Sequence, residues 1–162
     1  MCSSDLLALG RGASLPRRPR AWLDILVLSL LGSTFPFLLI PLGQREVASN
    51  IAAILNASVP IWTGVFVYLL LPSERLSSAR IAGLVLGFIG VAIVIGPGAG
   101  TIAGGLLGEV EILAASACYG AGAVYFRRHL AGGNTTLIAG LQSAIGFVLL
   151  TPIVLAAGAA PN

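Results

Sequence analysis

An amide, a proline and a hydroxyl interrupt one of the most apolar stretches of the chain, ILNASVPIWTGVFVYLLL at residues 54–71. Asn56, Pro60 and Thr63 follow the i, i+4, i+7 spacing that places residues on one face of a helix. A proline removes one backbone hydrogen bond and leaves a carbonyl free nearby. In lipid such groups need a protein partner or a water-lined cavity. We therefore predict that these residues line a substrate pathway, and helix packing alone is the alternative.

Other polar or helix-distorting residues stand at similar depth in neighbouring apolar stretches. Thr34 and Pro36 interrupt the stretch at 22–42. In the stretch at 107–126, Ser116, Tyr119 and Ala123 share one predicted helical stripe, with Cys118 and Gly120 beside it. Tyr119 is suited to hydrogen-bonding a substrate from a cavity wall, and equally to a satisfied position inside the bundle. These residues offer binding chemistry without charge.

Residues for catalysis or cofactor binding are scarce. The six acidic residues lie away from the predicted span centres, so none is an obvious proton carrier. His129 follows two arginines in a predicted connection, where solvation is the simpler interpretation. The glycine-rich GPGAG at 96–100 lacks the Lys-Ser/Thr of a phosphate-binding loop. We predict no enzyme activity, no cofactor and no metal site, and no nucleic-acid partner, because the arginines form no basic face with interleaved aromatics.

The elements that position these residues are predicted to be membrane-spanning helices. The chain is 57% hydrophobic and 9% charged, far from the ~25% charged residues of soluble domains. Each span needs about 20 apolar residues, and strands are excluded because the runs are continuous. We predict an all-α membrane helical bundle with five spans, at 22–42, 48–71, 81–96, 107–126 and 136–157.

The arginines predict an orientation. Eight of the nine fall before the first predicted span, between the second and third, or between the fourth and fifth. Arg45 alone lies on the opposite side. Because cytoplasmic connections are enriched in basic residues, the N-terminus is predicted in the cytoplasm. We expect an integral protein of the bacterial inner membrane, with the lipid bilayer as its surroundings.

The third predicted span carries three regularly placed glycines. Gly83 and Gly87 have the small-xxx-small spacing that lets helix backbones approach closely, and Gly90 follows one turn later. We predict a helix-packing face here.

The order of these segments resembles an EamA-type transporter of the drug/metabolite transporter superfamily. The resemblance is carried by PFLLIPLGQREVASNIAAILNASVPIWTGVFVYLLLPSERLSSARIAGLVLGFIGVAIVIGP at 36–97 and by GEVEILAASACYGAGAVYFRRH at 108–129. It extends over about residues 22–152. The segment at 36–97 is similar to a helix with a Gly-Gln turn, a helix through ILNASVP and a glycine-spaced helix. The segment at 108–129 is similar to the helix that opens the next repeat of the family.

This resemblance implies a ten-helix transporter of two inverted five-helix repeats, of which the chain would hold helices three to seven. The segments would be a cytoplasmic segment at 1–21, the end of the first repeat at 22–97, an outer connection at 98–106 and the start of the second repeat at 107–162. Substrate sites of inverted-repeat transporters lie near the midplane. By position, the cavity would be bordered by Thr34, Pro36, Asn56, Pro60 and Tyr119.

The expected function is secondary transport of small organic metabolites or drug-like compounds by alternating access. The chain would then be a fragment, completed by the missing half of the transporter or by a second copy. The alternative is a non-transporting accessory or assembly subunit derived from the same fold.

Overall fold

The computed structural model describes residues 19–71, 77–95 and 105–158. Every regular element in these ranges is a helix, which confirms the predicted all-α class. The elements are α2 (Pro19–Ser29), a π-helical turn η1 (Leu30–Thr34), α3 (Phe35–Gly43), α4 (Ser49–Asn56), α5 (Val59–Leu70), α6 (Ser78–Ile95), α7 (Leu106–His129) and α8 (Thr135–Gly158). The predicted segment at 1–21, apart from its last residues, and nearly all of the connection at 98–106 lie outside the described residues.

Among the described residues, four helical stretches are long and apolar enough to cross a membrane, namely 19–43, 49–70, 106–129 and 135–156. They correspond to four of the five predicted spans within a few residues. The third predicted span also forms a helix, α6, whose side chains are only partly described. Phe147, Leu155 and Leu86 are each 67% exposed, and such large apolar surfaces suit a lipid environment rather than water.

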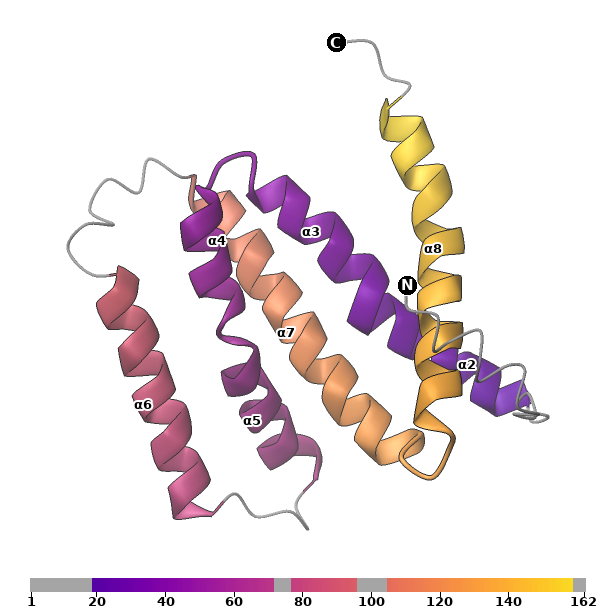
Figure 1. The fold of residues 1–162 in the computed structure, drawn as a ribbon, viewed down its shortest axis with the longest axis horizontal. Helices are drawn as coiled ribbons and strands as arrows, with labels where there is room; N and C mark the ends of the chain where they lie inside the picture. Colours follow the sequence, from indigo (N-terminus) through magenta and orange to yellow (C-terminus); the bar gives the residue numbers. More distant parts are fainter. Residues whose placement is uncertain (1–18, 72–76, 96–104, 159–162) are drawn as a thin grey trace. The chain divides into compact units, whose positions relative to one another are not determined.

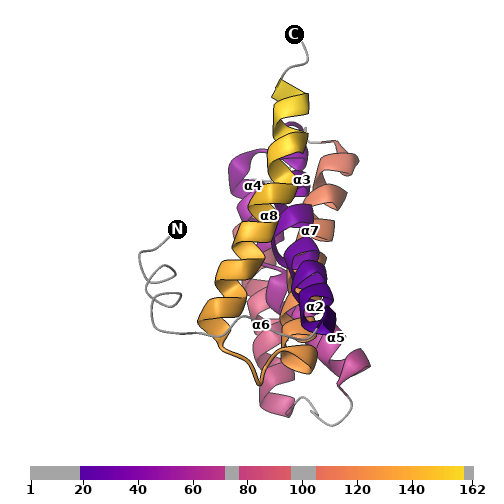
Figure 2. The same cartoon turned by 90° about the vertical axis from the view of Figure 1, so that its right-hand side faces the viewer.

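The chain divides into two compact units. The first contains α2, η1, α8 and the end of α7 from Tyr125. Figures 1 and 2 both draw α8 beside the stretch formed by α2 and η1. Its core contains Ile25, Leu28, Leu130 and Ile138. At one end, the Tyr125 hydroxyl donates a 2.8 Å hydrogen bond to Asp24.

Local chemistry explains where α7 ends and α8 begins. Arg127 and Arg128 occupy the last turn of α7, where their positive charge complements the helix dipole. Asn134 then stands just before α8 and accepts a 3.2 Å hydrogen bond from the Leu137 backbone N–H. This is the usual geometry of an asparagine N-cap.

The second unit contains α3 to α6 and α7 up to Val124. Its core contains Val47, Ala52 and Ile112. α3 and α7 meet through two glycines, since a Cβ at Gly43 would lie 2.6 Å from the Gly108 carbonyl oxygen, and one at Gly108 would lie 2.8 Å from the Gly43 oxygen. The Gly108 N–H donates to the Gly105 carbonyl at 2.9 Å and also to Glu46 Oε2 at 3.3 Å, so the Glu46 carboxylate lies against the first turn of α7.

Candidate functional site in the interrupted second span

The second predicted span is not one continuous helix. α4 ends at Asn56 and α5 begins at Val59, with Ala57 and Ser58 between them. The Ala57 N–H bonds both to Ala53 O at 3.0 Å and to Ile54 O at 3.1 Å, and the Ser58 N–H bonds to Leu55 O at 3.1 Å. The helix therefore tightens over these residues instead of unwinding. We call residues 56–60 the kink.

Pro60 explains why the helix is interrupted at this point. In a continuous helix the N–H of residue 60 would bond to the carbonyl of Asn56, and proline has no N–H to donate. Proline is tolerated in the first turn of a helix, where the N–H groups have no helical partner. Pro60 occupies such a position in α5.

Ser116 on α7 faces the end of α4. Its hydroxyl oxygen lies 3.0 Å from the Ile112 carbonyl oxygen, 3.3 Å from the Leu55 carbonyl oxygen and 3.3 Å from Asn56 Oδ1. A serine hydroxyl carries one proton, so it donates to one of these acceptors at a time. Ser116 is fully buried. It therefore joins the kink to α7 by polar contacts in the interior of two candidate spans.

Ser58 supplies a second hydroxyl to the kink. Its side chain is buried, and its Oγ has no hydrogen-bond partner among the described residues. It stands at the N-cap position of α5 without a capping side-chain bond. A buried hydroxyl without a partner is unfavourable, and such groups call for a functional explanation. The kink thus retains unused hydrogen-bonding capacity.

α5 and α7 come into backbone contact just beyond the kink. A Cβ added to Gly120 would lie 2.8 Å from the Thr63 backbone nitrogen and 2.9 Å from Trp62 Cβ. The Thr63 hydroxyl donates to the Val59 carbonyl at 2.9 Å, within its own helix. This close approach fixes α7 against the kink, because glycine alone leaves the required space.

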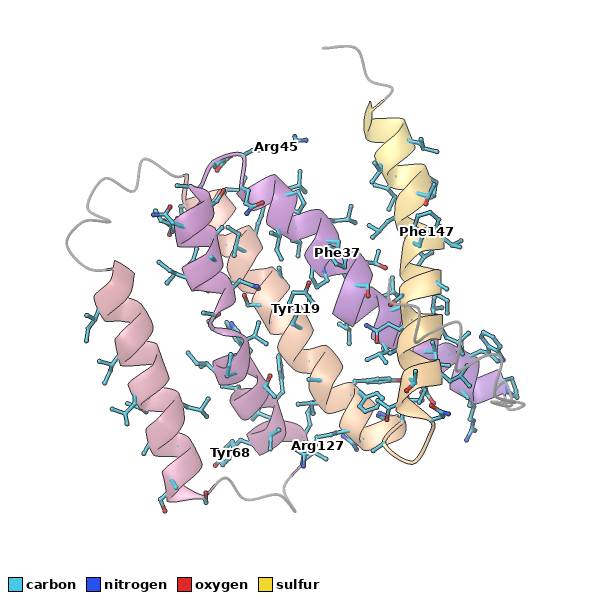
Figure 3. All side chains as sticks on the ribbon, in the orientation of Figure 1. Phe37, Arg45, Tyr68, Tyr119, Arg127 and Phe147 are labelled. Carbon is cyan, nitrogen blue, oxygen red and sulfur yellow. The ribbon has the colours of Figure 1, made fainter. Side chains whose placement is uncertain are left out.

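The predicted pathway residues occupy different surroundings. Asn56 and Thr63 are half-buried and lie where α7 crosses, while Pro60 is exposed. Tyr119 is half-buried about midway along α7, as Figure 3 shows.

Pro36 is buried in α3. Thr34 belongs to the other unit, where its side chain is buried and its Oγ1 has no hydrogen-bond partner within the described residues. Their role in a pathway stays a prediction.

The contact face of α7 differs from the predicted Tyr119 stripe. The face directed at α3, α4 and α5 runs through a row spaced by four, and Ala123 of the predicted stripe is exposed. That row consists of Gly108, Ile112, Ser116 and Gly120. The i, i+4 spacing of two glycines with a serine was the available signal, since small residues mark helix contacts in membranes.

The glycine face of α6 has no described neighbour. A Cβ at Gly83, Gly87 or Gly90 would meet nothing within 4 Å among the described residues. α6 instead contacts α5 where Leu84 covers Gly64, with its Cδ1 2.8 Å from a Cβ placed at that glycine. The packing role of the three glycines therefore stays a prediction, and it needs a helix beyond those described.

The fold and the kink define a polytopic helical membrane protein with polar groups inside its spans. The sequence model of the EamA-like transporter family matches residues 3–96, more than half of the chain. The chain belongs to this family, which confirms the resemblance, and the family consists of membrane transporters of the drug/metabolite type. No curated protein and no solved structure matches the chain.

Proposed function

We propose that this chain forms part of a secondary transporter for small organic metabolites or drug-like compounds, working by alternating access in the bacterial inner membrane. Its N-terminus lies in the cytoplasm, and the kink borders the substrate pathway. The further pathway residues are Thr34, Pro36, Thr63 and Tyr119. Membership of the EamA-like family supports a transporter of this general type.

One observation carries the proposal for the pathway. At the kink, the Ser116 hydroxyl lies 3.3 Å from both Asn56 Oδ1 and the Leu55 carbonyl oxygen, and the buried Ser58 hydroxyl beside them has no described partner. Substrate sites of inverted-repeat transporters are formed by interrupted helices near the bilayer centre. Neutral amide and hydroxyl groups there suit hydrogen bonds to a small polar or amphipathic solute.

An export assay tests this proposal. The chain is expressed in bacteria that lack their main drug exporters, and the efflux of ethidium and of ¹⁴C-labelled amino acids is measured. With the pathway completed by a second copy of the chain, we expect efflux above the empty-vector level, reduced about tenfold by Asn56→Ala and by Ser116→Ala at equal membrane abundance. Ser143→Ala is the matched control, because Ser143 is an exposed serine on α8. Efflux equal to the empty vector, or unaffected by both variants, argues against a pathway at the kink.

A second candidate function is favoured by the glycine face of α6. Three glycines with nothing described within 4 Å provide a surface on which another helix can pack closely. This supports a non-transporting accessory or assembly subunit derived from the same fold. Gly87→Leu should then abolish co-purification of a differently tagged copy or partner, while the efflux assay stays at the empty-vector level.

A further inference from the structure

The kink contains backbone carbonyls that lack their usual helical donors. Pro60 has no N–H, so the Asn56 carbonyl loses the donor four residues after it. The Ile61 N–H bonds to the Ser58 carbonyl at 2.9 Å instead of to the Ala57 carbonyl. Two consecutive backbone oxygens, those of Asn56 and Ala57, are therefore left without a backbone donor in the described part of the chain.

The donors at the start of α5 do not balance this excess. The Ile61 and Trp62 N–H groups both bond to the Ser58 carbonyl, at 2.9 Å and 3.3 Å, and Pro60 supplies no N–H at all. These N–H groups at the positive end of α5 are thus occupied, whereas carbonyls at the negative end of α4 stay free. The kink should therefore attract positive charge rather than negative charge.

The Ser58 hydroxyl is a second, independent sign of a ligand at this position. Three other hydroxyls, those of Thr63, Ser116 and Thr151, bond to the carbonyl four residues before them. Ser58 makes no such bond, although it is only 8% exposed, and its Oγ has no partner among the described residues. Its free oxygen directly follows the two free carbonyls in the chain.

One side of the kink is not covered by any described helix. Ala53, Ala57 and Pro60 are exposed, while α7 contacts the kink through Ser116. The kink also lies at the centre of the candidate span at 49–70, where free carbonyls in contact with lipid are costly. A hydrogen-bond donor from outside the described residues is therefore needed here.

We propose that the kink binds the ammonium group of a protonated organic amine. An ammonium group carries three N–H donors, and the free oxygens of Asn56, Ala57 and Ser58 can accept them. A carboxylate is disfavoured, because the sequence has no charged residue at 47–73 or at 112–126 to pair with it. The inference names the substrate class of the proposed pathway and rests on that proposal.

The experiment is binding of ¹⁴C-phenethylamine to the purified full chain in lipid nanodiscs, by scintillation proximity near neutral pH, with empty nanodiscs as the blank. Three competitors share its phenyl ring and two-carbon chain. Phenethyltrimethylammonium keeps the charge without an N–H, phenethyl alcohol keeps one donor without the charge, and 3-phenylpropionate reverses the charge. We expect saturable binding that unlabelled phenethylamine displaces at least tenfold more effectively than each competitor.

Pro60→Ala supplies the N–H that the Asn56 carbonyl lacks, so it should weaken binding about tenfold, the usual worth of one hydrogen bond to a charged group. Pro41→Ala is the matched control, an exposed proline inside α3, and should bind as the wild type does. If Pro60→Ala is poorly folded by size-exclusion chromatography, Ser58→Ala replaces it and should also weaken binding, with the exposed Ser143→Ala as its control.

Separate outcomes overturn the inference and the proposed function. Absence of saturable phenethylamine binding, equal displacement by phenethyltrimethylammonium, or full binding by both Pro60→Ala and Ser58→Ala overturns the amine site. Tighter binding of 3-phenylpropionate that depends on Pro60 would overturn the substrate class and leave a pathway at the kink. Phenethylamine binding with the expected variant effects, but without efflux from cells, would support the amine site and contradict transport.

Discussion

Gly120 shows how one small residue can determine a helix contact in the lipid-facing bundle. The nearest atoms to its missing side chain belong to the backbone of Thr63 and to Trp62 Cβ, so a neighbour cannot make room by rotating a flexible chain end. Gly120→Ala should destabilise the fold by about 1–3 kcal/mol, the usual range for overpacking a core. Gly83→Ala should change stability little, since its Cβ meets nothing within 4 Å among the described residues.

The measurement for this pair is unfolding in mixed micelles with increasing dodecyl sulfate, followed by circular dichroism. Equal midpoints for the two alanine variants would show that α5 and α7 do not touch at Gly120. A lower midpoint for Gly83→Ala would instead indicate that the α6 glycine face is already covered in the folded protein.

The interruption between α4 and α5 determines the shape of the whole second span. Pro60→Ala supplies an N–H that can bond to the Asn56 carbonyl, and one such bond contributes a net ~0.5–1.5 kcal/mol. We therefore expect amide hydrogen exchange at residues 57–61 to slow by about three- to tenfold, because one tenfold step corresponds to ~1.4 kcal/mol. The straighter helix should also reduce efflux.

Pro41→Ala is the control, since Pro41 is an exposed proline inside α3. Unchanged exchange at the kink would show that packing rather than Pro60 bends the helix.

For the helices as elements, the sequence predicted their positions along the chain better than the faces through which they contact one another. Runs of about 20 apolar residues locate spans because the bilayer fixes their length. The sides of those helices are harder to predict, since lipid is as apolar as the bundle interior and a polar face is therefore not required. This is why the Ser116 row of α7 and the η1 turn did not emerge from the sequence, while the disturbance at Pro60 did.

For the whole molecule, the arginine distribution predicts a topology that labelling can check. Gln44 lies in the turn between α3 and α4, and Gly132 in the turn between α7 and α8, and both are exposed. In a Cys2→Ser/Cys118→Ser background, Gln44→Cys should react with a membrane-impermeant maleimide added to intact cells. Gly132→Cys should react only after the membrane is opened. The reverse pattern would place the arginine-rich connections outside and contradict the predicted orientation.

The Ser116 hydroxyl has acceptors on both helices that meet at the kink. Two of its three acceptors belong to α4, and the third, the Ile112 carbonyl, belongs to its own helix. If the two helices draw apart, the proton rotates to Ile112 and no unpaired donor is left in the apolar interior. If they return, it rotates back. The Ser116 donor therefore keeps a partner whether or not α4 lies against α7, and a separation of the two helices would cost only the acceptor contacts at Leu55 and Asn56.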